Sequence, residues 1–375
     1  MYYHLILTDR CNLACTYCRG RTFFPSGQEE EGGPEIDLDL PPELGYEPEL
    51  LYRFLERDPD ASLIFYGGEP LLRPDLVSEM VRHAPARRFL VQTNGLLLDR
   101  IPRGVLNRMD SLLVSSIDGN REVTDRSRGE GTYRRVMENI RRVVREGYGG
   151  EIIARMTVAE GTDIAAAVRF LSHNPDFSFP SLHWQLDADL SFGNGNQGFA
   201  SWAHMTYNPG VLSLIDDWVG RMEAGGRVPR WYPFIDPLED LLAGRESPLR
   251  CGAGHANFTI MTDGSIGPCP CMVGLKDFYL GHIGSSDPKE LSMESPDGSF
   301  CTGCAIRSFC GGRCLYARIL RPWPEDMQRV VCGTVKNLHR GLTGILPRVR
   351  DLLKQGTIGM EDFTHPRYNG CEIIP

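Results

Sequence analysis

Short apolar runs alternate with amphipathic stretches over the first half of the chain. Runs rich in β-branched and aromatic residues predict strands at His4–Thr8, Leu63–Tyr66, Phe89–Thr93, Ser111–Ile117, Ile152–Val158 and Leu182–Leu186. Between them, helical spacing of apolar residues predicts helices at Pro48–Arg57, Pro74–His83, Pro102–Met109, Tyr133–Glu146 and Asp163–Ser172. Repeated strand–helix units favour a parallel sheet with right-handed crossovers. The pattern therefore predicts an α/β fold, a partial (β/α)6 TIM-type barrel.

Two segments interrupt this alternation. Residues 25–48 contain glycine, proline and an acidic run at Glu29–Glu31, which indicates an insertion or flexible lid, or simply a solvated acidic loop. Residues 191–250 predict a linker loop that leads into a helix near Pro209–Ala224. We expect a barrel over residues 1–190, a cysteine-rich domain over 251–335, and a helix and tail over 336–375.

Charge and hydropathy narrow the class of protein. The formal net charge of −9 argues against a nucleic-acid-binding face. No run approaches the ~18 apolar residues of a membrane helix, and the N-terminus does not resemble a signal peptide. We therefore expect a cytoplasmic protein with neither nucleic-acid nor membrane partners. In that reducing compartment, twelve cysteines indicate metal sites rather than disulfides.

Three cysteines follow the first predicted strand at a C-x3-C-x2-C spacing, namely Cys11, Cys15 and Cys18. Soft thiolates select zinc or iron–sulfur clusters, and a structural zinc site needs four ligands. Three thiolates on a four-iron cluster leave one iron open for a substrate or cofactor. Half of a zinc site, completed from elsewhere in the chain, is the alternative.

The spacing and position of this triplet resemble those of the radical S-adenosylmethionine (SAM) superfamily. Four further segments strengthen the resemblance, each at the end of a predicted strand or just after it: Gly67-Gly68-Glu69-Pro70, Gln92-Thr93-Asn94-Gly95, Ser116-Ile117-Asp118-Gly119, and Asp125 with Arg128. The resemblance implies that Gly67, Gly68, Glu69 and Pro70 meet the amino group of SAM and that Asn94 lies on the next conserved turn. It implies that the segment with Ser116 and Asp118 reaches the ribose and the methionyl part of SAM. It also implies that Arg128 pairs with the SAM carboxylate, and Tyr17 is a candidate to stack near the adenine. Taken singly, each segment is an ordinary turn.

A second cysteine array fills the C-terminal part of the chain. Its pattern resembles the SPASM domain, a two-cluster appendage of peptide-modifying radical SAM enzymes: Cys251, Cys269, Cys301, Cys304, Cys310, Cys314 and Cys332. The resemblance implies an outer auxiliary cluster on Cys301, Cys304, Cys310 and Cys332. It implies an inner cluster on Cys251, Cys269 and Cys314. A zinc ribbon around Cys301 and Cys304 is the alternative.

The array departs from the family pattern next to Cys269. Cys271 is an additional cysteine. Either the inner cluster takes it as a fourth ligand, or the cluster keeps an iron open for a substrate side chain, or Cys271 is a hydrogen-atom donor or proton carrier. Sulfatase-maturing relatives carry an aspartate general base where this chain has Pro270, which disfavours formylglycine formation. Asp187 and Asp189 are the alternative candidates for a catalytic base, unless they are turn or capping residues.

The resemblance implies an oxidoreductase that holds three [4Fe-4S] clusters and SAM. Reduced ferredoxin or flavodoxin would supply the electron that cleaves SAM to a 5′-deoxyadenosyl radical, which takes hydrogen from a residue of a peptide or protein. A thioether or carbon–carbon crosslink, an epimer and a dehydrogenated residue all stay open as products. The chain looks most like an archaeal family of peptide-modifying enzymes. With the first cysteine at residue 11, we expect no separate leader-binding domain before the barrel. A small-molecule radical dehydrogenase and a non-catalytic iron–sulfur electron carrier are the alternative classes.

Overall fold

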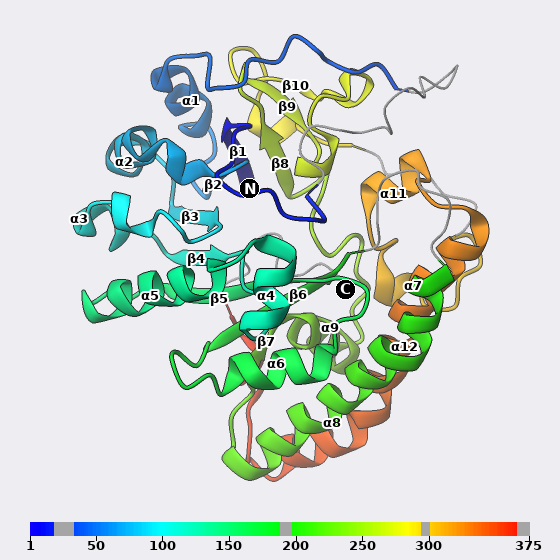
Figure 1. Ribbon diagram of the computed structural model, residues 1–375. Helices are drawn as coiled ribbons and strands as arrows, with labels where there is room; N and C mark the ends of the chain where they lie inside the picture. The colour runs from blue at the N-terminus through cyan, green and yellow to red at the C-terminus, as the bar shows by residue number, and fades with distance from the viewer. Residues whose placement is uncertain (19–33, 188–196, 294–300, 366–375) are drawn as a thin grey trace. The chain divides into compact units, whose positions relative to one another are not determined.

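The computed structural model describes residues 1–18, 34–187, 197–293 and 301–365 (Figure 1). The chain packs into two compact units. Unit one comprises Met1–Ile117, Thr124–Ile153 and Gly252–Ser295, and unit two comprises Asp118–Val123, Ala154–Cys251 and Pro296–Pro375. Helix α4 (Arg121–Arg128) and strand β5 (Glu151–Val158) each have residues in both units.

Unit one is built on a mixed sheet with strand order β10-β9-β8-β1-β2-β3-β4. The strands are β1 (Tyr2–Thr8), β2 (Ser62–Gly67), β3 (Arg88–Thr93), β4 (Ser111–Val114), β8 (Asn257–Ile260), β9 (Ser265–Gly267) and β10 (Gly281–His282). Neighbouring strands from β8 to β4 are parallel, whereas β9 and β10 are antiparallel to their neighbours. The predicted α/β fold with a parallel sheet is therefore confirmed, while the barrel closure stays a prediction.

Helices α1–α3 and α5 lie along one side of the strands of unit one (Figure 1). The helical segments of this unit are α1 (Pro48–Leu55), η1 (Pro70–Leu72), α2 (Pro74–His83), η2 (Leu98–Arg100), α3 (Arg103–Leu106), α5 (Thr132–Arg145), η4 (Pro270–Met272), η5 (Lys276–Phe278) and η6 (Pro288–Glu290). Helices α1 and α2 begin at prolines, whose missing N–H costs nothing in a first turn. Helix α5 buries Val136, Ile140 and Val143 on one face, as its helical periodicity predicts.

Unit two pairs strand β6 (Ser181–Leu186) in parallel with β7 (Arg230–Trp231). Its helical segments are α6 (Ile164–Ser172), α7 (Gln197–Trp202), η3 (Ala203–Tyr207), α8 (Asn208–Gly225), α9 (Tyr232–Ala243), α10 (Arg307–Cys310), α11 (Leu315–Leu320), α12 (Glu325–Lys354) and η7 (Met360–Phe363). The ring of Phe234 packs edge-on against Trp184 at 5.1 Å and against Trp218 at 5.5 Å between centroids. These aromatic side chains form the centre of the core of unit two.

Strand β8 comes from the cysteine-rich segment, where the hydrophobic pattern predicts no strand. It pairs with β1 from Tyr2↔Asn257 to Leu5↔Ile260, and the His4 ring lies 2.9 Å from the amide oxygen of Asn257. A strand of four residues that is buried throughout shows neither alternation nor helical periodicity. Long-range pairing with β1 therefore decides its structure.

Among the described residues, no helix is long and apolar enough to cross a membrane.

Candidate cofactor and cluster sites

The cysteine triplet forms a loop directly after β1 in unit one. The Thr16 amide donates to the Ser127 carbonyl at 2.9 Å, and the Cys18 amide donates to the Cys15 carbonyl at 3.0 Å. Cys11 and Cys18 are exposed and Cys15 is half-buried. The backbone is thus held in place while the thiols remain accessible, which fits a cluster bound by three thiolates.

Gly67 and Gly68 bring the turn after β2 against the start of this loop. The Gly68 amide donates to the Thr8 carbonyl at 2.9 Å, and the Glu69 amide donates to the Arg10 carbonyl at 2.8 Å. A Cβ on Gly67 would lie 2.2 Å from the Thr8 oxygen, and one on Gly68 would lie 2.2 Å from the Arg10 oxygen. From the sequence, the two glycines are expected to let the backbone approach SAM closely. The structure shows a second reason, because the start of the cysteine loop also lies against them.

Glu69 is fully buried at the carboxyl end of β2. Its Oε1 accepts from the Leu71 amide at 2.9 Å and the Thr93 hydroxyl at 2.7 Å, and its Oε2 accepts from the Asn94 amide at 2.7 Å. Burial raises the pKa of the carboxyl, and the three donated hydrogen bonds act in the opposite direction. The carboxylate therefore fixes the turns after β2 and β3 against each other.

Asn94 extends this line of polar groups to the cysteine loop and to the end of β4. Its Nδ2 donates to Asn12 Oδ1 at 2.7 Å and lies 3.9 Å from the Cys11 sulfur. The buried Ser116 hydroxyl donates to the Asn94 carbonyl. The carboxyl ends of β2 and β3 and the turn after β4 thus bring Glu69, Asn94 and Ser116 together, as in other parallel sheets with a site at this edge.

Arg128 approaches the triplet from the end of α4. Its Nη1 lies 3.8 Å from the Cys15 sulfur, and its guanidinium carbon lies 4.9 Å from the centroid of the Tyr17 ring. The side chain is 6% exposed, so its charge acts in a poorly solvated setting. The predicted residues Tyr17 and Arg128 are therefore in contact with each other.

Two of the predicted acids, Asp118 and Asp187, belong to unit two. Asp118 is buried and accepts from the Thr157 amide at 2.9 Å, which ties the turn after β4 to β5. Asp187 is half-buried directly after β6, and its amide donates to the Val158 carbonyl at 3.0 Å. Asp189 and Glu29–Glu31 lie outside the described residues. The structure assigns no base among these acids.

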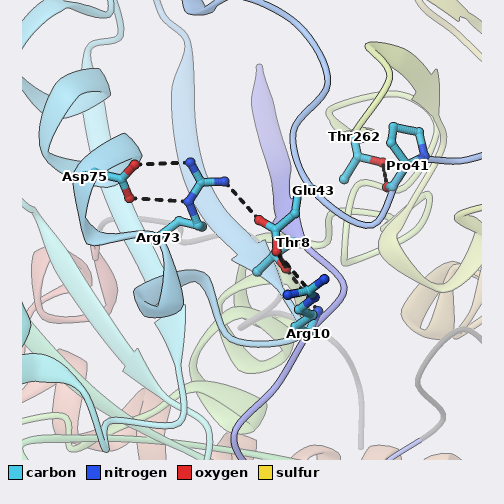
Figure 2. A network of polar contacts seen from close by, with 7 residues as sticks. All are labelled: Thr8, Arg10, Pro41, Glu43, Arg73, Asp75 and Thr262. Atoms are coloured by element: carbon cyan, nitrogen blue, oxygen red, sulfur yellow. Dashed lines mark hydrogen bonds and ion pairs between the residues drawn. The ribbon is translucent and has the colours of Figure 1, made fainter.

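Residues 34–45, which we call the strap, lie beside the cysteine loop at their C-terminal end (Figure 2). Glu43 accepts from the Thr8 hydroxyl at 3.0 Å and from Arg73 Nη1 at 2.9 Å, and Arg10 Nε lies 3.7 Å from the same carboxylate. The Asp9 amide donates to the Pro42 carbonyl at 3.0 Å. This end of the strap therefore holds the chain where β1 passes into the cysteine loop.

The other end of the strap lies against the segment that follows Cys271. The Asp37 amide donates to the Gly274 carbonyl at 2.8 Å, and the Lys276 amide donates to the Glu35 carbonyl at 2.9 Å. The Tyr279 hydroxyl donates to Asp37 Oδ2 at 2.9 Å. The described part of the expected lid is therefore pinned at both ends within unit one.

Five cysteines of unit two surround one pocket. It is lined by Cys301, Cys304, Cys310, Cys314 and Cys332, with Ile306, Arg307, Gly312, Arg313, Ala317, Arg318, Trp323, Gln328, Val335 and Lys336. Nε2 of Gln328 lies 3.1 Å from the Cys332 sulfur. Among the described residues, no three His, Cys, Asp or Glu side chains converge on the position of a single metal ion. The thiols instead line a cavity, which fits a larger group such as a cluster.

Two arginines that the sequence analysis did not single out support this cysteine-rich region. Arg250 is 3% exposed, donates to the Phe309 carbonyl from Nε at 3.0 Å and from Nη2 at 2.9 Å, and pairs with Asp240 at 2.8 Å. It thereby fixes the residue before Cys310. Arg313 lines the pocket itself. Their only signal in the sequence is position, because each directly precedes a cysteine.

The cysteines predicted to hold the inner cluster are divided between the units. Cys269 is buried in unit one and Cys251 is buried in unit two, whereas Cys271 and Cys314 are half-buried. Cys269 precedes the short helix η4, whose first residue is Pro270. The ligand set of this cluster stays a prediction.

Three accessible thiols on one loop at the carboxyl end of a parallel strand fit a four-iron cluster that has one open iron. Residues 5–171 match the family model of the Radical SAM superfamily. This match agrees with the resemblance that the cysteine triplet and the segments after the strands carry in the sequence.

Relatives of known activity share more than this range. The chain is 26% identical over 332 residues to the cysteine-type anaerobic sulfatase-maturating enzyme of Clostridium perfringens, covering 82% of this chain and 86% of the relative. It is also 26% identical to the mycofactocin maturase MftC of Mycobacterium tuberculosis, covering 85% and 79%. Both relatives are maturases, and both alignments are long enough to include most of the cysteine-rich part.

A solved structure described as native anSMEcpe with bound AdoMet and Cp18Cys peptide has the same fold. The TM-score is 0.68 at 21% identity, and the match covers 94% of this chain and 99% of that chain. At this identity the similarity establishes the fold alone.

Proposed function

We propose that the chain is a radical SAM maturase that takes a hydrogen atom from a residue of a peptide or protein in the reducing cytoplasm. The observation that carries this proposal is the arrangement in unit one. Three accessible thiols follow β1, and beside them lie the buried Glu69, Asn94 and Ser116, with Arg128 next to Cys15. A three-thiolate cluster with its cofactor needs this combination of soft ligands, an acid and a cation.

The residues of unit one have separable roles in this proposal. Cys11, Cys15 and Cys18 would hold the [4Fe-4S] cluster, which supplies the electron for reductive cleavage of SAM. Glu69 accepts three hydrogen bonds, and a carboxylate has about four acceptor sites, so one is left for the ammonium group of SAM. Arg128 would pair with the SAM carboxylate, and Tyr17, already against Arg128, would border the adenine.

The choice of a peptide or protein substrate is supported by the names of the relatives. One is a sulfatase-maturating enzyme, and the solved structure of the same fold holds a peptide beside AdoMet. The type of modification is left open by the chain's own residues. Pro270 stands where sulfatase-maturing relatives carry an aspartate, and Asp187 is the described candidate for a base after β6.

The auxiliary sites complete the proposal. Cys301, Cys304, Cys310 and Cys332 would hold the outer cluster, and Cys251, Cys269 and Cys314 the inner one. We assign Cys271 to the inner cluster as its fourth ligand, since it lies two residues from Cys269 and is half-buried. A reduced ferredoxin or flavodoxin is the proposed electron donor.

The proposal is tested by the production of 5′-deoxyadenosine from SAM by anaerobically reconstituted protein with a strong reductant. We expect product from the wild type and none from the Cys11/Cys15/Cys18→Ala variant. The Cys301/Cys304→Ala variant is the matched control, because it also loses thiols but keeps the triplet, and it should still form product. A wild type that is loaded with iron yet neither binds SAM nor forms 5′-deoxyadenosine would contradict the proposal. Where the wild type forms product, peptides encoded beside the gene are the next to be screened for mass changes.

A further inference from the structure

The loop between Cys310 and Cys314 has an unusual backbone. Gly311, Gly312 and Arg313 all have positive φ values, of 63°, 97° and 58°. Glycine adopts this region freely, whereas a residue with a Cβ does so at a cost. Among the described residues, Arg313 and Arg321 are the non-glycine residues with positive φ. Position 313 therefore carries a long side chain although its backbone conformation favours glycine.

Arg313 lines the five-cysteine pocket, and its side chain carries an unsatisfied donor. Its guanidinium carbon lies 5.8 Å from the centroid of the Trp323 ring, and both residues line the pocket. Its Nε is buried and has no hydrogen-bond partner within the described ranges. A buried N–H without an acceptor is unfavourable, so this donor needs an acceptor that the described polypeptide does not provide.

The charged side chains that line the pocket, apart from the thiols, are all cationic. Arg307, Arg313, Arg318 and Lys336 line it together with the five cysteines, and no acidic side chain is among the lining residues. The pocket is thus suited to a group that carries negative charge and accepts hydrogen bonds through sulfur.

We propose that Arg313 is a positioning residue that raises the reduction potential of the outer auxiliary cluster, by placing a positive charge and the Nε–H donor in its pocket. Added positive charge and hydrogen bonds to sulfur favour the reduced, more negative state of an iron–sulfur cluster. This inference rests on the proposed assignment of a cluster to the five-cysteine pocket. It adds the side chain that controls that cluster and implies that the outer cluster is suited to accept an electron.

The test is a redox titration of the reconstituted full chain, followed by electron paramagnetic resonance. The signal of the outer cluster is identified as the one that Cys301/Cys304→Ala removes. Arg313→Met should shift its potential to more negative values, and Arg313→Lys, which keeps the charge without the Nε–H, should shift it less. Arg313→Gly suits the backbone, so it should fold at least as well as the wild type and still shift the potential. Arg350→Met removes an exposed charge from the same helix as Cys332, about 27 Å away along the axis, and should leave the potential unchanged.

Each other result overturns the inference. An unchanged potential in Arg313→Met at wild-type iron content would leave the cluster assignment standing and remove the role of Arg313. An equal shift in Arg350→Met would show that only total charge matters. If Arg313→Met, Arg313→Lys and Arg313→Gly all lost the cluster, Arg313 would be needed for the pocket to bind the cluster at all rather than to set its potential. If instead no signal of the wild type disappeared in the Cys301/Cys304→Ala variant, the pocket would hold no such cluster, and its proposed function would be contradicted.

Discussion

At the scale of single residues, Glu69 shows how a motif residue serves structure and chemistry together. Its three hydrogen bonds hold the turns after β2 and β3 in place whether or not a cofactor binds. Replacing it by alanine would leave the Thr93 hydroxyl and two backbone amides without their acceptor, at about 1–3 kcal/mol for each donor. Sensitivity to Glu69→Ala therefore does not by itself distinguish a SAM enzyme from an electron carrier.

Gly68→Ala should disturb the cysteine loop. The new Cβ would lie 2.2 Å from the Arg10 oxygen and 2.5 Å from that of Asp9, and both are backbone atoms that cannot turn aside. We expect a loss of about 1–3 kcal/mol in the free energy of unfolding, measured with urea, and less iron on the triplet.

Gly104→Ala is the matched control, because its Cβ would meet nothing within 4 Å and it lies in helix α3. Alanine should be neutral or slightly stabilising there, since it forms helices better than glycine. Equal unfolding midpoints and iron contents in the two variants would refute the steric explanation of Gly68.

At the scale of elements, the strap connects two motifs that are far apart in the sequence. Glu43 and Pro42 hold it at the cysteine loop, and Asp37 and Glu35 hold it at the segment after Cys271. The glycines and acids of this segment predict an insertion, but its anchors are long-range hydrogen bonds of both backbone and side chains, which leave no periodic pattern in the sequence. The described part is therefore a fixed connection rather than a free lid.

Tyr279→Phe should loosen one end of the strap alone. It removes the hydroxyl that donates to Asp37 Oδ2 at 2.9 Å and keeps the ring. The loss of about 1 kcal/mol corresponds to roughly fivefold faster hydrogen exchange at the amides of Asp37 and Lys276. The Leu44 amide, which donates to the Leu7 carbonyl at 3.0 Å, serves as the internal control. Unchanged exchange at Asp37, or equal acceleration at Leu44, would show that the hydroxyl does not anchor this end.

At the scale of the whole molecule, the sequence predicts those strands and cysteine motifs that are specified by residues close together in the chain. Strands β1–β6 and the cysteine triplet are evident because alternating apolar runs and fixed thiol spacing are local signals. Strand β8 is not evident, because only its pairing with β1 makes it a strand. The unsatisfied Nε of Arg313 is likewise a property of the packed loop, which no sequence motif reports.

The division into units leads to a prediction about metal content. The triplet Cys11, Cys15 and Cys18 belongs to unit one, while Cys301 and Cys304 belong to unit two. Because neither set contributes to the other's proposed cluster, losses of iron should add when both are removed. The fully reconstituted chain should hold about twelve iron atoms, as three clusters of four.

Removing either set should therefore lower the iron content to about eight atoms, and removing both should lower it to about four. Iron and acid-labile sulfide, measured together after anaerobic gel filtration, provide the count. Zinc in place of sulfide in the triplet-free variant would favour the zinc ribbon around Cys301 and Cys304. Loss of all iron from the Cys301/Cys304→Ala variant would show instead that the outer pocket is required for the remaining sites to form, and the clusters would then have to be treated as one cooperative assembly.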